Sequence, residues 1–144
     1  MRKFIFSISI GVLALSSACG DSTVTRYSTV QDAKNGRLFE RGWVPEVLPD
    51  TAGPLIEAHN IDTNVRCALA EFPPATFAEV LAALSRVGFH HYDAPVPPPP
   101  LNACPFSNGD FRQDSVVMRR TGVSGDQEFV GVSKSGTFMF MGIK

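Results

Sequence analysis

The clearest chemistry in the sequence belongs to the thiol of Cys19, which directly follows an apolar segment. Arg2 and Lys3 give the chain a positive start, and the apolar run from Phe4 to Leu15 is shorter than the ~20 residues needed to cross a bilayer. This order of charged and apolar residues is typical of a secretory signal. The small residues before the cysteine resemble a lipobox, in which the thiol receives diacylglycerol. We therefore predict cleavage after Ala18 and lipidation of Cys19.

The match to a lipobox is imperfect, because Ser16 stands where a leucine is usual and Leu15 comes one place early. Ser16 and Ala18 also fit the small-x-small rule of plain secretion, which stays open as the alternative. We favour lipidation because the apolar run ends directly at a cysteine. Gly20 follows that cysteine, and a residue other than aspartate there is typical of sorting to the outer membrane in Gram-negative bacteria. We expect acyl chains such as palmitate to hold the chain at the periplasmic face of that membrane.

The cysteine count supports this assignment. Cys19, Cys67 and Cys104 make an odd number, and an unpaired thiol is a liability in an oxidising compartment. Lipidation of Cys19 leaves two thiols that can pair. We predict a Cys67–Cys104 disulfide, because disulfides persist in the compartment to which the signal directs the chain. The alternative is two unpaired thiols, with Cys67 buried as a small apolar residue.

Patterns that would indicate catalysis or metal binding are weak. His90, His91 and Asp93, with His59 and Asp62, could supply metal ligands, yet no cysteine stands at ligand spacing. Histidines on the surface or in loops are the better interpretation. The sequence contains no Gly-x-Ser-x-Gly elbow, no P-loop and no dinucleotide fingerprint. We therefore expect no enzyme activity, no metal site and no cofactor.

The polar cluster Asp62-Thr63-Asn64 is the segment most suggestive of a binding site. It comes just before an expected strand, where these residue types commonly form turns through hydrogen bonds between side chain and backbone. A structural turn is the interpretation we prefer. The functional alternative is that Asp62, Thr63 and Asn64 form the polar lip of a binding site.

The composition indicates one globular domain and argues against a nucleic-acid partner. Of the 144 residues, 44% are hydrophobic and 19% are charged, as in a folded chain. The 13 basic and 14 acidic residues provide no basic excess for binding phosphates or anionic lipid, and signal cleavage removes two of the positive charges. We expect a signal peptide at 1–18, a lipidated cysteine with a short tether at 19–27, and one globular domain at 28–144.

Hydrophobic periodicity predicts strands in the second half of the chain. Alternating or continuous apolar residues indicate strands near 65–72, 115–119, 129–133 and 137–143. Ser133 to Gly136 should join the last two as a hairpin turn. Both faces of 137–143 are apolar, which is typical of a central strand.

One amphipathic helix is predicted at 76–87, between the first two of these strands. Thr76 and Glu79 form a capping box, an apolar stripe follows at helical spacing, and Gly88 ends it. A shorter helix is expected at 28–34 with Ser28 as its cap, an extended segment at 38–44, and either strand or helix at 55–59. The predicted fold class is α+β, a small antiparallel sheet with one main amphipathic helix packed on one face.

The first half of the chain carries motifs that resemble those of a known family. Phe39-Glu40-Arg41-Gly42-Trp43-Val44-Pro45 is followed by Leu48-Pro49, Ile56 and Asn60-Ile61-Asp62-Thr63-Asn64. This set resembles the Arg-Gly-Trp-Leu-Pro, Leu-Pro and Asp-Leu-Asp-Thr-Asn motifs of small proteobacterial lipoproteins, the YbbD head domain family. Val44 and Asn60 depart from the pattern, and the resemblance covers residues 26–72 best. It implies a lipoprotein and no particular biochemical activity.

Together these observations predict a membrane-anchored envelope lipoprotein that acts as a non-enzymatic binding or structural module. Its expected partners are the membrane, through the N-terminal lipid, and an envelope protein, whereas nucleic acid is not expected. The alternative is a periplasmic immunity or inhibitor protein that neutralises a toxin or a hydrolase.

Overall fold

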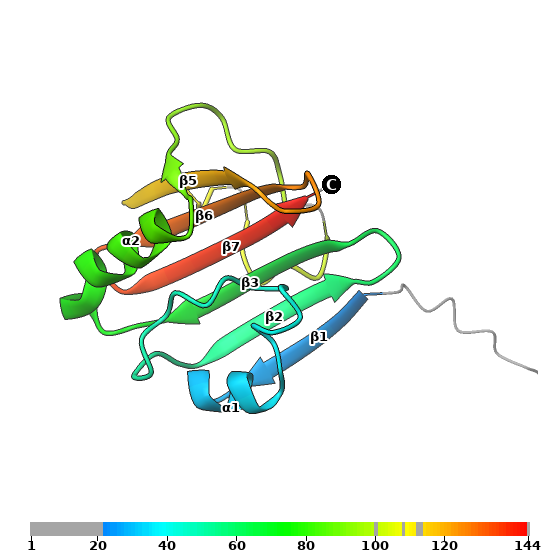
Figure 1. The fold of residues 1–144 in the computed structure, drawn as a ribbon, viewed down its shortest axis with the longest axis horizontal. Helices are drawn as coiled ribbons and strands as arrows, with labels where there is room; N and C mark the ends of the chain where they lie inside the picture. Colours follow the sequence, from blue (N-terminus) through cyan, green and yellow to red (C-terminus); the bar gives the residue numbers. More distant parts are fainter. Residues whose placement is uncertain (1–21, 100, 108, 112–113, 144) are drawn as a thin grey trace, which may run out of the picture.

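A single antiparallel sheet of seven strands forms the centre of the molecule, in the spatial order β1-β2-β3-β7-β6-β5-β4 (Figure 1). The computed structural model describes residues 22–99, 101–107, 109–111 and 114–143, so the predicted signal peptide and Cys19 lie outside the described part. The strands are β1 Ser22–Tyr27, β2 Leu55–Asn60, β3 Val65–Glu71, β4 His90–His91, β5 Ser115–Thr121, β6 Gln127–Ser133 and β7 Thr137–Ile143. Within these ranges no helix is long and apolar enough to cross a membrane.

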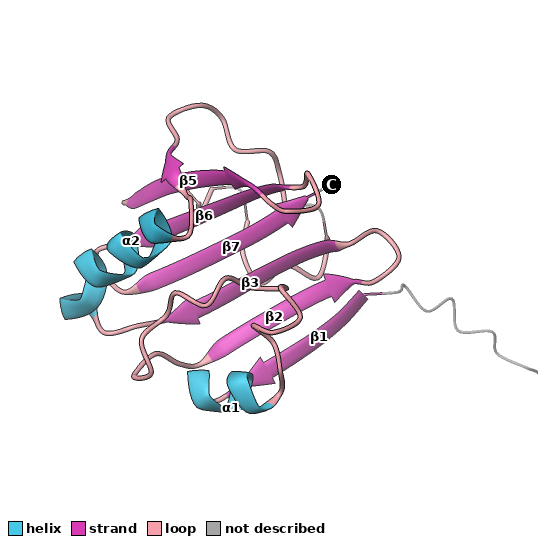
Figure 2. Cartoon of the chain, viewed as in Figure 1, coloured by secondary structure: helices cyan, strands magenta, loops and turns pink. Residues whose placement is uncertain are grey.

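The predicted α+β class is wrong, because the sheet dominates the fold and the helices are short (Figure 2). They are α1 Val30–Asn35, the single 3-10 turn η1 Pro74–Thr76, and α2 Phe77–Arg86. The strands expected from periodicity are present as β3, β5, β6 and β7, and β1, β2 and β4 extend the sheet on both sides. Residues 22–27, expected to be tether, pair with β2 along their whole length. This segment is polar and exposed, so its apolar residues do not alternate in a way that predicts a strand. It is a strand because it pairs with β2.

Strand β7 is central, as its two apolar faces predicted. It lies between β3 and β6, with Phe138 and Phe140 in the core on one side and Met139 and Met141 on the other. The predicted hairpin turn precedes it: Gly136 has a φ of 93°, and its N–H donates to the carbonyl of Ser133 at 3.1 Å. Glycine adopts this backbone conformation at little cost.

One surface of the sheet, here called the helix face, is covered by α1, α2 and the connection 37–54 (Figure 1). The apolar stripe of α2 contributes Val80 and Leu84, and the connection contributes Leu38 and Val44. This connection consists of turns and not of the extended segment expected at 38–44. The main helix therefore covers only part of the face, because a chain segment without regular structure supplies the rest.

The opposite surface, here called the disulfide face, is covered by the described residues of the long loop 92–114. Val96, Phe106 and Phe111 of the loop pack in one cluster with side chains of β3, β5, β6 and β7. The predicted disulfide is confirmed: Cys67 on β3 is bonded to Cys104 in the loop, with 5.7 Å between their Cα atoms. The bond attaches the loop to the sheet.

Both helices begin differently from the prediction. Thr29, and not Ser28, caps α1, because its hydroxyl accepts from the N–H of Asp32 at 3.0 Å. Thr76 forms no capping box, since its hydroxyl donates to the carbonyl of Pro73 at 2.8 Å within η1. The two consecutive prolines favour this tight turn before α2 can start.

Candidate functional site

A row of polar residues crosses the helix face at one end of the sheet. His59 on β2 lies opposite Arg66 on β3, and Arg66 lies opposite Gly142 on β7. The row continues through Glu128 on β6 to Arg120 on β5. Residues that are opposite in register share one face of a sheet, so these side chains lie together. This end of the sheet carries the turns 61–64 and 122–126.

Arg66 is the centre of a buried ionic network in this row. The residue is only 6% exposed. Its guanidinium donates hydrogen bonds to the carboxylates of Asp126 and Glu128. Glu128 also accepts from Arg120. The arginine reaches β6 by lying across Gly142, where an added Cβ would come within 2.9 Å of Arg66 Cζ. A glycine in the apolar strand β7 is therefore required by the path of this side chain.

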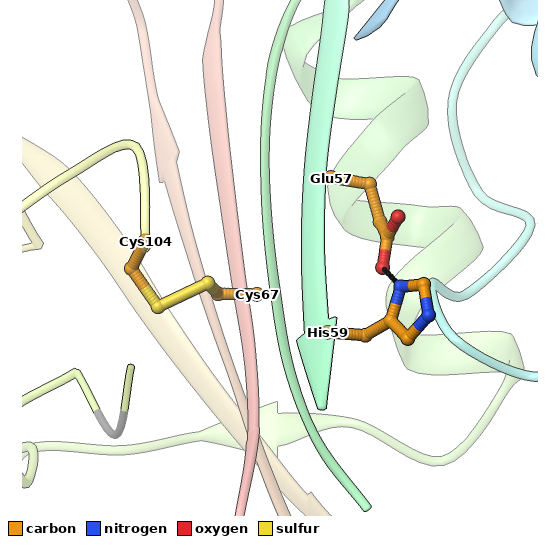
Figure 3. The surroundings of a disulfide bond; sticks show 4 residues. All are labelled: Glu57, His59, Cys67 and Cys104. Atoms are coloured by element: carbon orange, nitrogen blue, oxygen red, sulfur yellow. Dashed lines mark hydrogen bonds and ion pairs between the residues drawn. A yellow bond between two sulfur atoms is a disulfide. The ribbon is translucent and has the colours of Figure 1, made fainter. Parts of the chain in front are cut away.

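A second buried polar pair, Glu57 and His59, projects from β2 onto the helix face, opposite in direction to the disulfide (Figure 3). Oε1 of Glu57 and Nδ1 of His59 are 2.6 Å apart. Burial raises the pKa of Glu57 to about 7, although the nearby Arg41 acts to lower it. Burial, followed by Arg41, lowers the pKa of His59. Both shifts favour the uncharged forms, between which a hydrogen bond joins the carboxyl and the imidazole.

The Arg-Gly-Trp motif lies above this pair as a stack of planar groups. The ring of Trp43 packs on His59 with 3.7 Å between ring centroids, and the guanidinium of Arg41 lies 4.9 Å from the Trp43 ring. Gly42 between them has a φ of 70°, which glycine adopts readily and which turns the chain. Arg41 is exposed, and its guanidinium forms no ion pair with any residue in the described part of the chain.

These elements enclose a hollow of about 230 Å³, here called the end pocket. It is lined by Arg41, Gly42, Trp43, Asn64, Arg66, Arg120, Val123, Ser124, Asp126 and Glu128. Asp126 and Glu128 already bind Arg66 and Arg120, whereas the exposed guanidinium of Arg41 is accessible to a ligand and has hydrogen-bonding capacity left. A free guanidinium beside an aromatic ring can bind a carboxylate or a phosphate. The volume is below the ~300–1,000 Å³ typical of small-molecule sites, and it suits one acidic group better than a cofactor.

The structure places one of the three proposed lip residues at this pocket. Asn64 lines it, and its carbonyl accepts from Arg66 at 3.2 Å. Asp62 and Thr63 lie in the preceding turn, away from the lining. The turn is held by the side chain of Asn60, which accepts from both the N–H and the hydroxyl of Thr63 at 2.9 Å. Asp62 and Thr63 thus occupy the structural turn, and Asn64 alone belongs to the site.

The other candidates from the sequence lie apart. His90 and His91 form the exposed edge strand β4, where His91 approaches Asp93 at 3.3 Å. His59, by contrast, is buried on β2 beneath Trp43. Among the described residues no three His, Cys, Asp or Glu side chains are arranged to hold a metal ion. Cys19 lies outside the described part.

Neither the buried network nor the Glu57–His59 pair is predicted by the sequence patterns described above. Glu57 and His59 are two positions apart, so they share a face in an extended segment, but the sequence of 55–59 is compatible with either a strand or a helix. The isolated Gly142 in an apolar strand was the other available signal, because it indicates a close approach by another group. Neither signal indicates which residue makes the contact, because the contacting residues come from other parts of the chain.

We predict that the carboxyl of Glu57 makes stability depend on pH. A carboxyl whose pKa is raised by folding binds its proton more tightly in the folded state, so folding is weakened as the pH rises from about 4.5 through about 7. Glu57→Gln keeps the size of the side chain and removes this titration. Relative to the variant, the wild type should lose on the order of 1 kcal/mol or more between about pH 5 and about pH 8.

Urea unfolding of both proteins across this pH range measures the difference. His59 is present in both, so the difference reports the carboxyl together with its hydrogen bond to His59. Glu79→Gln, the same change at an exposed position of α2, is the control and should leave the pH profile unchanged. Parallel profiles for the wild type and Glu57→Gln would contradict the prediction.

Comparison with known proteins confirms the resemblance seen in the motifs. Residues 21–68 match the family model of the YbbD head domain. The matched segment runs from β1 into β3 and contains Arg41, Trp43, the Glu57–His59 pair and Arg66. The hairpin of β5 and β6, which completes the end pocket, lies outside it. No curated protein and no solved structure matched the chain.

Proposed function

With residues 21–68 matching the YbbD head domain, we propose that the protein is a lipid-anchored, non-catalytic binding module of the cell envelope. Its binding site is the end pocket, and its ligand is an acidic group presented by an envelope protein. Lipid on Cys19 holds the domain at the periplasmic face of the outer membrane. The observation that carries the proposal is that Arg41, Gly42, Trp43 and Asn64, which belong to the two longest motifs, converge on one pocket.

The geometry supports binding over catalysis. Glu57 and His59 have the shifted pKa values typical of catalytic groups. Both are buried, however, and the ring of Trp43 lies against His59 while it lines the pocket. A substrate in the pocket would meet the indole ring and the guanidinium of Arg41, and neither group transfers protons at neutral pH. The pair thus serves to support Trp43 from below.

A photo-crosslinking amino acid at position 124 tests the site in living cells. Ser124 is exposed and lines the pocket, whereas Lys134 is exposed in the turn at the opposite end of the sheet and is the matched control. We expect a discrete protein adduct from position 124 and none from 134. The adduct should disappear in Arg41→Ala, because the exposed guanidinium contributes to ligand binding and not to the core.

The outcome also separates the proposed roles. Equal adducts from both positions, or an adduct that survives Arg41→Ala in a folded protein, would contradict a pocket-specific partner. A toxin or a hydrolase as the captured partner would instead identify the inhibitor role.

The lipid anchor is tested by Cys19→Ala. The wild type should appear in the membrane fraction and incorporate a labelled fatty acid, because acylated chains stay in the bilayer. The variant should lose the label and move to the soluble fraction. Retention of both label and membrane association in Cys19→Ala would contradict anchoring at this residue.

A further inference from the structure

The chain joins the sheet at the same end that carries the end pocket. Strand β1 begins at Ser22, which pairs with Asn60 beside the β2–β3 turn (Figure 1). The β5–β6 turn lies at this end as well, since Gln127 pairs with Ile143 near the end of β7. These two turns, 61–64 and 122–125, are here called the tips. We infer that the tips lie against the phospholipid bilayer, with Ile61 and Val123 in its interfacial region.

The length of the connecting chain is the first reason. This step rests on the proposed anchor at Cys19, which precedes Ser22 by three residues in the sequence. A trans backbone spans at most ~3.6 Å per residue, so the lipidated residue lies within about 11 Å of the start of β1. A tether this short keeps one end of the sheet near the bilayer. That end carries the tips, and the β6–β7 turn at Lys134 lies at the other end.

The exposure of apolar side chains is the second reason. Ile61 is 72% exposed and Val123 is fully exposed, and they are the first residue of the turn 61–64 and the second residue of the turn 122–125. Turns are normally polar, as at the opposite end of the sheet, where Lys134 and Ser135 are exposed. Two aliphatic side chains would not bind a bilayer by themselves. Next to a lipid anchor they meet it at a high effective concentration, and a weak contact is then sufficient.

The charge beside the tips fits a phospholipid surface. Arg41 is exposed without an ion pair among the described residues, and Asp126 near the β5–β6 turn is neutralised by Arg66. The exposed acid of the tips is Asp62. The tips therefore present one exposed carboxylate beside an exposed guanidinium, so their charge does not oppose an anionic surface, although the whole chain carries a net charge of −1. The local charge at this end of the sheet, and not the overall composition, is what meets the bilayer.

Depth measurement with tryptophan tests the orientation. The mature chain is coupled through the Cys19 thiol to a maleimide lipid, which is specific because the other cysteines form the disulfide. The vesicles contain phosphatidylethanolamine and phosphatidylglycerol with brominated acyl chains. In a Trp43→Phe background, which removes the single native tryptophan, one reporter is introduced at a time by Ile61→Trp, Val123→Trp or Lys134→Trp. Bromine should quench the first two reporters several-fold more than the third.

A longer tether separates attraction by the tips from confinement by the anchor. With a flexible insert of ~20 residues after Gly20, quenching of Val123→Trp should persist, and adding Ile61→Ser should reduce it several-fold. Equal quenching at all three positions, or loss of quenching with the long tether alone, would overturn the inference. Because coupling at Cys19 is chemical, either result is independent of natural lipidation and of the crosslink at position 124.

Discussion

Replacing Arg66 by methionine should lower the free energy of unfolding by about 3–5 kcal/mol at neutral pH. Arg66 is 6% exposed, and the carboxylates that it binds, those of Asp126 and Glu128, are 2% and 3% exposed. Methionine fills a similar volume but donates no hydrogen bond. Glu128 keeps Arg120 as a partner, whereas the side chain of Asp126 is left as a buried charge without an ion-pair partner among the described residues. The loss of stability therefore arises mainly from the carboxylate of Asp126, which stays buried without its partner.

Two further variants identify this cause. Arg37→Met removes an exposed ion pair with Glu40 and should cost less than about 1 kcal/mol. Adding Asp126→Asn to Arg66→Met should recover part of the lost stability, because it removes the unpaired charge. Urea unfolding followed by circular dichroism measures all of them. A loss for Arg66→Met as small as that for Arg37→Met would contradict a buried network at the end of the sheet.

Removing the disulfide with Cys67→Ala and Cys104→Ala should cost about 3–4 kcal/mol, since the bond closes a loop with a sequence separation of 37. The reason is the larger conformational entropy of the unfolded chain without the crosslink. Alanine is the appropriate replacement because Cys67 is fully buried, and serine would add a buried hydroxyl. The variant should show a lower denaturation midpoint in urea than the oxidised wild type.

The effect should begin in the loop that covers the disulfide face. Phe106 and Phe111 stay packed on the sheet only while the loop 92–114 is in place, and Cys104 is its covalent attachment. Limited proteolysis should therefore cut this loop in the double variant before the sheet unfolds. Dithiothreitol should produce the same pattern in the wild type and no change in the double variant. Resistance to protease that is equal with and without the bond would contradict this role.

The pattern of apolar residues was sufficient to predict four strands, and the number of cysteines with the expected oxidising compartment predicted the disulfide. β3, β5, β6 and β7 each carry apolar residues at a spacing of two or in a continuous run, and such a segment buries them only as a strand. The two apolar faces of β7 also indicated that it is central. For the cysteines, setting Cys19 aside left a single possible pair. The four strands depend on the spacing of apolar residues along the chain, and the disulfide depends on the number of cysteines. Neither prediction requires knowing which residues are neighbours in the folded protein.

Strands β1 and β2 depended on tertiary structure. β1 is largely polar and exposed, and it is a strand because its backbone pairs with the edge of β2. β2 contains Glu57 and His59, residue types that are usually exposed, and here they are buried because the connection with Trp43 covers them. The predicted fold class was wrong for this reason: the additional strands come from segments in which pairing and coverage, not apolar spacing, decide the conformation.

The candidate site was decided almost entirely by tertiary structure. The sequence by itself showed an Arg-Gly-Trp motif, a polar Asp-Thr-Asn turn and a glycine in an apolar strand. It could not show that Arg66 binds Asp126, which is 60 residues away along the chain. That contact depends on strand order and register, because only the arrangement β3-β7-β6 with Gly142 in the middle lets an arginine reach across a strand. Residue types therefore determined which groups were available, and the sheet determined which of them meet.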